Sequence, residues 1–443
     1  MKVPWEVGRV LTPIEFNTYY KQVIRDCRHC SIRPKEHLPL IDFPLLMKPG
    51  EWPRLSKLTE KLSQEVAAAE RELLQRPDLY ESLGLPANIA KILRGCSSKC
   101  RPKGFARVMR FDFYLTEEGW MFSEANPDAA GGWIEAYGLT RAMAACYPGF
   151  SPPPNPAAAY AEAMRKFAGK GAMVGFFHVG VRAAAWCPEF ILKEVEQRGM
   201  RGFLANPRRV VWNSNFAEVL TPSGIVRPNL LIRMLIANWL PRLRNRALWE
   251  PWFCGSKTPI SNPACSVLVE SKRLPLVYKE LDTPMTLHRA YSPESQSPTE
   301  IPRRSQNEWV FKPAFGVGGQ AIGIAGVNKK AAFKKIAEEA RRNAVNWVAQ
   351  RRFKSIPVPT ERGPGHVCLG IYTVDGVAAG VFGRIRGKPL INHRAMSIPV
   401  LISQGDLEDG KVKEGGTVKN STQDDLVNEY NRHQGNGGSC KMV

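Results

Sequence analysis

The sequence lacks long apolar segments. No stretch approaches the roughly 18 consecutive apolar residues of a membrane span, and the first residues, MKVPWEVGRVLTPIEF, contain no apolar core of a signal peptide. We therefore expect a cytoplasmic protein without a membrane partner. Cysteine is also sparse, with ten residues in 443. Without a secretory signal, we expect these ten side chains to be reduced thiols.

Acidic residues are few relative to basic ones. The chain has 41 Asp and Glu against 62 Lys and Arg, which gives a formal net charge of +21. Residues 404–443 do not supply this excess, because they contain five basic and seven acidic residues. A positive charge on the folded body favours anionic partners such as nucleotides, phosphates or nucleic acid. The basic residues are dispersed and form no recognised nucleic-acid-binding motif, so a basic nucleic-acid-binding protein is kept as an alternative.

Two common nucleotide-binding motifs are absent as well. The segment FKPAFGVGGQAIG places Lys312 at the end of a strand and Gly316, Gly318 and Gly319 in the following loop. No Gly-Lys-Ser/Thr completes a Walker A loop, and the spacing and downstream acid of the dinucleotide fingerprint are missing. Glycines still allow backbone N–H groups to surround phosphate oxygens, and a lysine adds charge. Glycine turns after strands are common, however, so this loop alone indicates little.

The order of helical and strand-like segments predicts an α+β fold. Residues 1–105 are expected to form a helical N-terminal region, and 106–150 a hairpin followed by a helix. After the stiff linker SPPPNP, residues 157–245 alternate between helix and strand and predict an α/β unit with a parallel sheet. Residues 260–403 are expected to be mostly strands, with a helix over 265–281 and a hairpin at VDG. The polar residues 404–443 are expected to be a disordered tail.

The segment VMRFDFYLTEEGWMFSEAN, residues 108–126, predicts a hairpin with an unusual polar face. A turn at 117–119 places Asp112 opposite Glu124 and Arg110 opposite Asn126. All four have even numbers and project from one face, while the odd face forms the core, interrupted by Ser123. The predicted core residues are Met109, Phe111, Phe113, Leu115, Met121 and Ala125.

Two facing carboxylates require a positive charge between them. Opposed side chains have Cβ atoms only about 4.5–5.5 Å apart. Asp112 and Glu124 together with the Asn126 amide offer three hard oxygen ligands, which suit Mg²⁺. A solvated sheet face with a salt bridge to Arg110 is an equal alternative at this point.

These residues resemble the circularly permuted ATP-grasp superfamily of glutathionylspermidine synthase. That family carries an Arg-x-Asp and, twelve residues after the Asp, a Glu-x-Asn on a hairpin, and RFD and EAN match both residue types and spacing. The resemblance covers about residues 108–402 and implies an ATP-grasp core at 106–150 and 260–403, with an inserted pre-ATP-grasp-like unit at 157–245. It implies Asp112, Glu124 and Asn126 as magnesium ligands and Arg110 as a contact of the transferring phosphoryl group.

The resemblance also implies the residues that bind ATP. ESK and FKP resemble the two family lysine motifs and indicate Lys272 and Lys312, although Ser replaces the family Asn before Lys272. VAQRRF resembles the strand end beside the adenine and indicates Gln350, and the glycine loop would close over the phosphates. Glu135 resembles a family glutamate near the substrate, with an exposed helical glutamate as an equal alternative.

The family activates a carboxylate with ATP and joins it to an amine through an acylphosphate. The resemblance therefore implies an ATP- and Mg²⁺-dependent ligase that acts on a small-molecule or peptide carboxylate and an amine. The change before Lys272 leaves open an inactive, nucleotide-binding relative. A third class is a zinc protein, because Cys27 and Cys30 with Cys96 and Cys100 could supply four thiolates, although free cysteines are the favoured interpretation.

Overall fold

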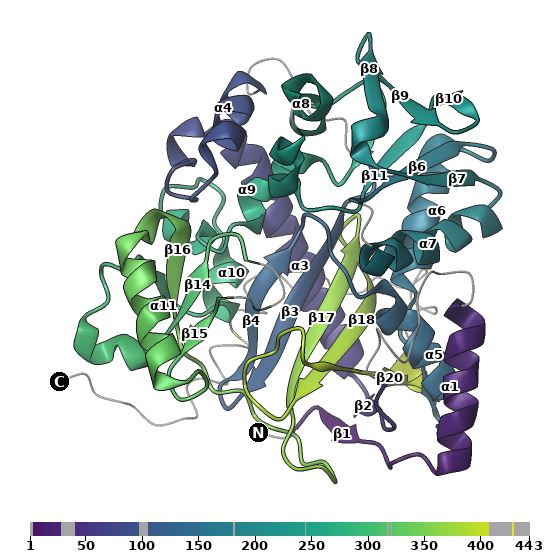
Figure 1. The fold of residues 1–443 in the computed structure, drawn as a ribbon. Helices are drawn as coiled ribbons and strands as arrows, with labels where there is room; N and C mark the ends of the chain where they lie inside the picture. The colour runs from purple at the N-terminus through teal and green to yellow at the C-terminus, as the bar shows by residue number, and fades with distance from the viewer. Residues whose placement is uncertain are drawn as a thin grey trace.

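The computed structural model has an α+β fold, and its described residues form five β-sheets and helices that cover them (Figure 1). The structure describes residues 3–27, 40–96, 105–179, 182–243, 245–316, 319, 321–406 and 428. Gly318, Cys30 and Cys100 lie outside this part of the chain, as does most of the predicted tail. No helix within the described ranges is long and apolar enough to cross a membrane.

A five-stranded antiparallel sheet forms the centre of the molecule. It joins two segments that are far apart in the sequence, in the order β19-β18-β17-β3-β4. Its strands are β3 (Val108–Thr116), β4 (Gly119–Asn126), β17 (His366–Val374), β18 (Val377–Arg386) and β19 (Met396–Ile398). β17 and β18 are joined by the predicted hairpin turn, in which Asp375 and Gly376 both have positive φ. Pairing of β3 with β17 brings residues near 112 beside residues near 370.

The β3–β4 hairpin has the predicted pairing around its polar residues. Arg110 faces Asn126 and Asp112 faces Glu124. A β-bulge beyond Asp112 then shifts the register by one, so that Phe113 faces Phe122 and the turn contains two residues instead of three. Phe122 consequently occupies the core position predicted for Met121, and its ring contacts those of Phe111 and Phe113.

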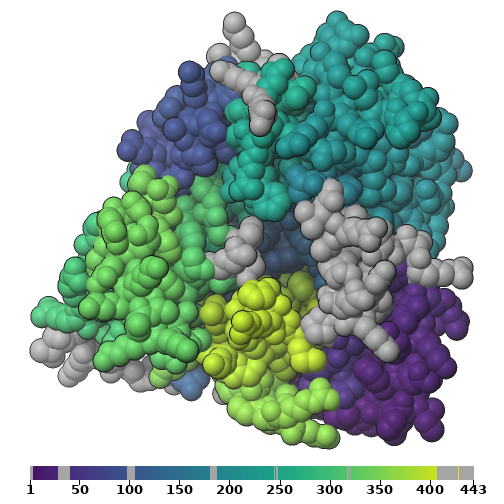
Figure 2. Space-filling view, in the orientation of Figure 1, coloured from purple at the N-terminus to yellow at the C-terminus, as the bar shows by residue number. Residues whose placement is uncertain are grey.

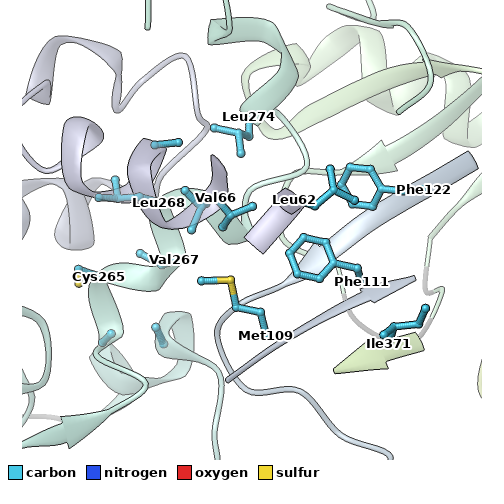
Figure 3. Close-up of a cluster of buried hydrophobic side chains, with 14 of the residues drawn as sticks. Leu62, Val66, Met109, Phe111, Phe122, Cys265, Val267, Leu268, Leu274 and Ile371 are labelled. Atoms are coloured by element: carbon cyan, nitrogen blue, oxygen red, sulfur yellow. The ribbon is translucent and has the colours of Figure 1, made fainter. Parts of the chain in front are cut away.

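The apolar face of the central sheet packs on the long helix α3 (Glu51–Leu73). The buried residues of this helix recur every three or four positions, as expected for one apolar face. Figure 3 shows Leu62 and Val66 of α3 near Met109 and Phe111 of β3 and Phe122 of β4. Ile371 of β17 belongs to the same buried cluster. This packing fixes which face of the hairpin is buried, and therefore which face its polar residues take.

A second antiparallel sheet lies beside the central one, in the order β13-β16-β14-β15. Its strands are β13 (Ser295–Gln296), β14 (Trp309–Pro313), β15 (Gly323–Ile324) and β16 (Trp347–Arg351). Helix α11 (Lys330–Arg342) covers it and buries Phe333, Ala337 and Ala340 against the sheet (Figure 1). Short helices α9 (Val267–Glu270) and α10 (Thr286–Tyr291) connect this part to the rest of the chain.

A parallel sheet follows from the alternation of helix and strand after the proline-rich linker. Its order is β12-β11-β6-β7, and all neighbours are parallel. The strands are β6 (Met173–Phe177), β7 (Arg201–Ala205), β11 (Leu230–Arg233) and β12 (Ile260–Ser261), with helices α6 (Pro156–Ala168) and α7 (Arg182–Gln197). A three-stranded meander projects from this unit (Figure 1), formed by β8 (Val210–Asn213), β9 (Phe216–Thr221) and β10 (Gly224–Val226).

The N-terminal region is less helical than predicted. Helices α1 (Pro13–Cys27), α3 and α4 (Ala87–Cys96) are present. However, β1 (Trp5–Val7) and β2 (Leu45–Met47) form a sheet with β20 (Val400–Ser403) and β5 (Phe150–Ser151). The predicted helix over 265–281 is also interrupted: Ser271 is extended, with ψ of 124°, and Pro275 cannot donate to a continuous helix.

The cysteines differ from the sequence-based expectation. Cys96, at the end of α4, forms a disulfide with Cys254, at the end of α8 (Arg246–Cys254), with a Cα–Cα distance of 5.1 Å. The prediction of ten reduced thiols is therefore wrong for this pair. The four-cysteine zinc hypothesis is wrong for Cys96, whose sulfur is already bonded. No cluster of three or more His, Cys, Asp or Glu suited to a metal occurs in the described ranges.

Candidate functional site

A cavity of about 700 Å³ lies where the central and second sheets meet. In the space-filling view, the dark-blue surface around β3 and β4 lies at the bottom of a hollow between green, teal and yellow parts (Figure 2). Eight of the ten predicted site residues line this cavity. They are Arg110, Glu124 and Asn126 from the hairpin, and Lys272, Lys312, Gly316, Gly319 and Gln350 from the later segments. The fold thus brings together residues that are up to 240 positions apart.

The polar face of the hairpin is held by a carboxylate between two arginines. Asp112 is 1% exposed. Its Oδ1 accepts from Arg110 Nε at 2.7 Å, and its Oδ2 accepts from Arg110 Nη2 at 3.0 Å and Arg384 Nη2 at 2.9 Å. Gly370 lies opposite Asp112 on β17, and a Cβ there would lie 2.7 Å from Arg110 Cδ. Gly370 therefore leaves the space that the Arg110–Asp112 pair occupies.

Glu124 pairs with the first predicted lysine. Lys272 Nζ lies 3.2 Å from Glu124 Oε2 and donates to the Gly316 carbonyl at 2.9 Å. Burial alone would raise the pKa of Glu124, but Lys272 and Lys312 lower it to about 2. Burial likewise opposes the charge of Lys272, yet Glu124 and Glu270 raise its pKa above the ordinary value. Both groups are therefore charged at neutral pH.

Lys312 occupies a different electrostatic position, although it is close to the same carboxylate. It lies on β14, paired with Val348 of β16, and is 9% exposed. Burial lowers the pKa of Lys312 to about 8, and the charge of Lys272 contributes to the decrease. Lys312 has no acidic partner within ion-pair distance in the described residues, so an anion entering the cavity would compensate its charge.

The glycine loop follows β14 and contacts the opposite wall. Gly319 has a φ of +71°, and a Cβ there would lie 2.8 Å from Asn392 Cβ and 2.9 Å from the Ile391 carbonyl oxygen. A side chain at this position would therefore be strained and would clash with the wall. Gly316 contributes its carbonyl group to Lys272. Gly318, predicted for the same loop, lies outside the described residues.

Gln350 lies in β16, lines the cavity and is 5% exposed. Its Nε2 donates to Ser295 Oγ at 3.2 Å, whereas its Oε1 is buried without a hydrogen-bond partner in the described residues. An unpaired buried carbonyl oxygen costs free energy unless a ligand donates to it. Gln350 is therefore a candidate acceptor for a donor group of a bound molecule.

Sequence reasoning missed two charged residues of the cavity wall, Arg384 and Glu270. Arg384 lies on β18 next to Cys368 of β17, a pairing that requires the tertiary sheet. Glu270 ends α9, and its Oε2 is buried without a hydrogen-bond partner in the described ranges. Burial and the charge of Asp128 raise the pKa of Glu270 to about 8. The position of Glu270 two residues before Lys272 was the only signal in the sequence.

The donor set partly fits a magnesium ion. Glu124 Oε1 accepts no hydrogen bond in the described residues, and Asn126 donates through Nδ2 at 3.5 Å to the Arg110 carbonyl, which leaves Oδ1 as a ligand. A carboxylate and an amide oxygen suit this cation. Both oxygens of Asp112 already accept from guanidinium groups. Asp112 as a direct metal ligand therefore stays a prediction, because Arg110 alone already donates to both of its oxygens.

Comparison with known proteins gives a structural similarity for the fold but no information on the chemistry. No protein-family model matches the sequence, and no curated protein matches it. Among solved structures, the chain is similar to a glutathione synthetase-like effector (GSS30) from Globodera pallida in its apo form. The match covers 89% of this chain and 100% of that chain, with a TM-score of 0.58 and 12% sequence identity. The two proteins share a fold. At 12% identity, the similarity to this structure concerns the backbone arrangement alone.

Proposed function

We propose that the protein is an ATP- and Mg²⁺-dependent carboxylate–amine ligase with a circularly permuted ATP-grasp fold. The observation that carries this proposal is the convergence of the Arg110, Glu124 and Asn126 hairpin with Lys272 and Lys312 on one cavity. The hairpin precedes the lysines in the chain, which is the order expected of the permuted family. The glutathione synthetase-like fold supports the same class.

The reaction would consume one carboxylate, one amine and one ATP. A carboxylate oxygen attacks the γ-phosphorus, the bond to the β-phosphate oxygen breaks, and ADP leaves. The amine then attacks the acylphosphate carbon, inorganic phosphate leaves with the carboxylate oxygen, and the amine loses a proton as the amide forms. Phosphoryl transfer depends mainly on positioning and charge neutralisation, which the cationic groups of the cavity can supply without a nucleophilic side chain.

The residues would divide this work according to their positions. Lys272 and Lys312 would bind the phosphates, since both ammonium groups border the cavity next to the glycine loop. Arg110 would offset charge on the moving phosphoryl oxygens. Glu124 and Asn126 would hold Mg²⁺, which neutralises the phosphate oxygens when bound. The loop containing Gly316 and Gly319 would exclude water that could hydrolyse the acylphosphate.

The double variant Asp112→Asn/Glu124→Gln tests this proposal. ADP release by the full-length protein would be measured with Mg·ATP against pooled carboxylates and pooled amines, with product mass identifying the bond formed. We expect the wild-type protein to release ADP and the double variant to release none, because the variant loses two carboxylates that organise the charges of the cavity. Near-ultraviolet circular dichroism would establish that the variant retains its fold.

A matched control is available in the same hairpin. Glu117→Gln/Glu118→Gln also converts two acids to amides, but both residues are exposed at the turn. It should leave ADP release unchanged. Survival of ATP consumption in Asp112→Asn/Glu124→Gln, with the same products, would falsify the ligase assignment.

A nucleotide-binding protein without ligase activity is the second candidate. The observation that favours it is the engagement of both Asp112 oxygens by arginines, which leaves one carboxylate fewer for a metal. Calorimetry with Mg·ATP separates the two functions. Saturable binding without ADP release from any carboxylate–amine pair would support this candidate, and amide formation would exclude it.

A further inference from the structure

One end of the cavity has features that phosphate binding does not explain. Phe382 of β18 forms its wall, with the Arg110 guanidinium 5.7 Å and the Arg384 guanidinium 5.5 Å from the ring centroid. Gly132 packs directly on this ring, since a Cβ there would lie 2.6 Å from Phe382 Cδ1. Glu135 also lines the cavity, and it lies on the turn of residues 134–139, which packs against β18. An aromatic wall with cations and a carboxylate around it can recognise a ligand that carries both charges.

The two arginines at this end differ in how many donors remain. Arg110 uses Nε and Nη2 for Asp112 and Nη1 for the Gly131 carbonyl, at 2.8 Å. Arg384 uses only Nη2, which donates to Asp112 and, at 3.6 Å, to the Cys368 sulfur. Its Nε and Nη1 make no hydrogen bond within the described ranges, and its side chain is 20% exposed. Arg384 is therefore held in place with donors free for an anion.

Glu135 is the complementary group. It lies in a π-helical turn (Ile134–Leu139), and its carboxylate makes no ion pair or hydrogen bond with another side chain of the described residues. Burial raises the pKa of Glu135, while Arg110 and Arg384 lower it only in part. A cation beside this carboxylate would compensate the burial. A π-helical turn is a frequent feature of functional sites.

We propose that this end of the cavity binds an amino acid or the end of a peptide as a zwitterion, with its carboxylate on Arg384 and its ammonium group on Glu135. This inference rests on the proposed ligase, for which it names the amine substrate as one that carries its own carboxylate. In the proposed ligase, the phosphates would be bound by Lys272, Lys312 and the glycine loop. ATP binding therefore does not require the free donors of Arg384. The Glu135 carboxylate would repel a phosphate and attract an ammonium group.

A series of three probes with the same methyl group tests the proposal. L-Alanine carries both charges, L-alaninamide only the ammonium group, and propanoate only the carboxylate. Binding to the full-length protein would be measured without nucleotide by saturation-transfer NMR on the methyl protons. We expect L-alanine to bind at least about tenfold more tightly than either truncated probe. The measurement does not depend on ATP turnover, so it separates failure of this inference from failure of the ligase assignment.

Variants identify the groups that bind each charge. Arg384→Gln should reduce alanine binding to the alaninamide level without changing alaninamide binding, and Glu135→Gln should reduce it to the propanoate level without changing propanoate binding. Arg384→Lys, which keeps the charge, should retain part of the affinity. Arg386→Gln is the control, because Arg386 lies two residues along β18 and donates to the Leu390 carbonyl. Equal binding of alanine and alaninamide, no saturable alanine binding, or an equal loss of all three probes in Arg384→Gln would overturn the proposal.

Discussion

Two buried Asp–Arg clusters in this molecule differ in how completely their polar atoms are used. In the first, Arg233 donates to Asp128, to the carbonyl groups of Leu235, Asn262 and Pro263, and to Ser266 Oγ. Asp128 also accepts from the Ala237 N–H and from Ser266. Both side chains are at most 2% exposed. All nitrogen atoms of this guanidinium group and both carboxylate oxygens therefore have partners inside the protein.

The second cluster is built from the same residue types around Asp112, but it is not closed. Arg384 keeps donors free, and its side chain is 20% exposed to the cavity. Nearby, Gln350 Oε1 and Glu270 Oε2 are buried without partners in the described residues. A saturated cluster fixes the fold, whereas a cluster with unused donors and acceptors can bind a ligand. Completeness of hydrogen bonding thus distinguishes the structural ion pair from the candidate functional one.

The largest effect is expected when the saturated cluster is broken. Asp128→Asn leaves the Arg233 charge buried without a counter-charge, and we expect a loss of about 3–5 kcal/mol in the free energy of unfolding. Urea denaturation followed by tryptophan fluorescence measures it. The double variant Asp128→Asn/Arg233→Met removes both charges and should recover part of the loss. An Asp128→Asn loss below 1 kcal/mol would contradict a structural role for this pair.

For the cavity residues we expect the free energy of unfolding to depend on pH. Burial gives Glu270 a pKa of about 8 in the fold, above its ordinary 4.5, and gives Lys312 a pKa of about 8, below its ordinary 10.5. Between pH 4.5 and 8 the folded state retains the Glu270 proton that the unfolded state has lost, so stability falls as pH rises. Between pH 8 and 10.5 the unfolded state retains the Lys312 proton that the folded state has lost, so stability rises. These two groups therefore produce a stability minimum near pH 8.

Matched variants show which residue causes each part of this pH profile. Lys312→Met should remove the rise above pH 8, which amounts to roughly 3 kcal/mol, and Glu270→Gln should remove the fall below it. Denaturation midpoints would be measured in wild type and variants from pH 5 to 10, and only differences from wild type would be interpreted. Parallel profiles for wild type and Lys312→Met would show that Lys312 is protonated in the fold throughout. Mg·ATP binding should be accompanied by proton uptake near pH 8, because phosphate favours the charged lysine.

A smaller loss of stability is expected at Asp112, despite its similar burial. Asp112→Asn leaves Arg110 and Arg384 without a counter-charge, but both arginines line the cavity, where water or anions can reach them. We expect a loss of about 2 kcal/mol, together with loss of ATP turnover. Added sulfate should stabilise this variant more than wild type, since an anion can replace the missing carboxylate. Equal responses to sulfate would contradict an open cluster.

The sequence predicts the polar hairpin well because its pairing depends on local spacing. Arg110 and Asn126, like Asp112 and Glu124, face each other as their positions around the turn require. The bulge, which places Phe122 in the core position predicted for Met121, depends instead on packing against Phe111 and α3. Strands β1 and β2 contain three residues each, too few to show a period, and form only by pairing in the sheet of β20.

Long-range contacts account for the remaining differences. Arg384 reaches Asp112 across 272 residues through the β3–β17–β18 pairing, and Cys96 reaches Cys254 across 158 residues. Neither contact leaves a periodic signal in the sequence. The motif residues were recognisable because their residue types and spacing match those of the family that they resemble. Arg384 and Glu270 were not, because a single Arg or Glu at a strand or helix end is common on any protein surface.

The smallest predicted difference concerns the serine in each cluster. Ser266 is fully buried and donates to Asp128 Oδ1 at 2.9 Å, whereas Ser123 is half-buried and donates to the Asp112 carbonyl at 3.2 Å. Ser266→Ala should cost about 1 kcal/mol, because one hydrogen bond to a buried charge is lost. Ser123→Ala should cost a few tenths of a kcal/mol, since water from the cavity can replace the hydroxyl. Urea midpoints at an unchanged m-value measure both losses. Equal losses would mean that water does not reach the bulge beside Asp112, and that the second cluster is as closed as the first.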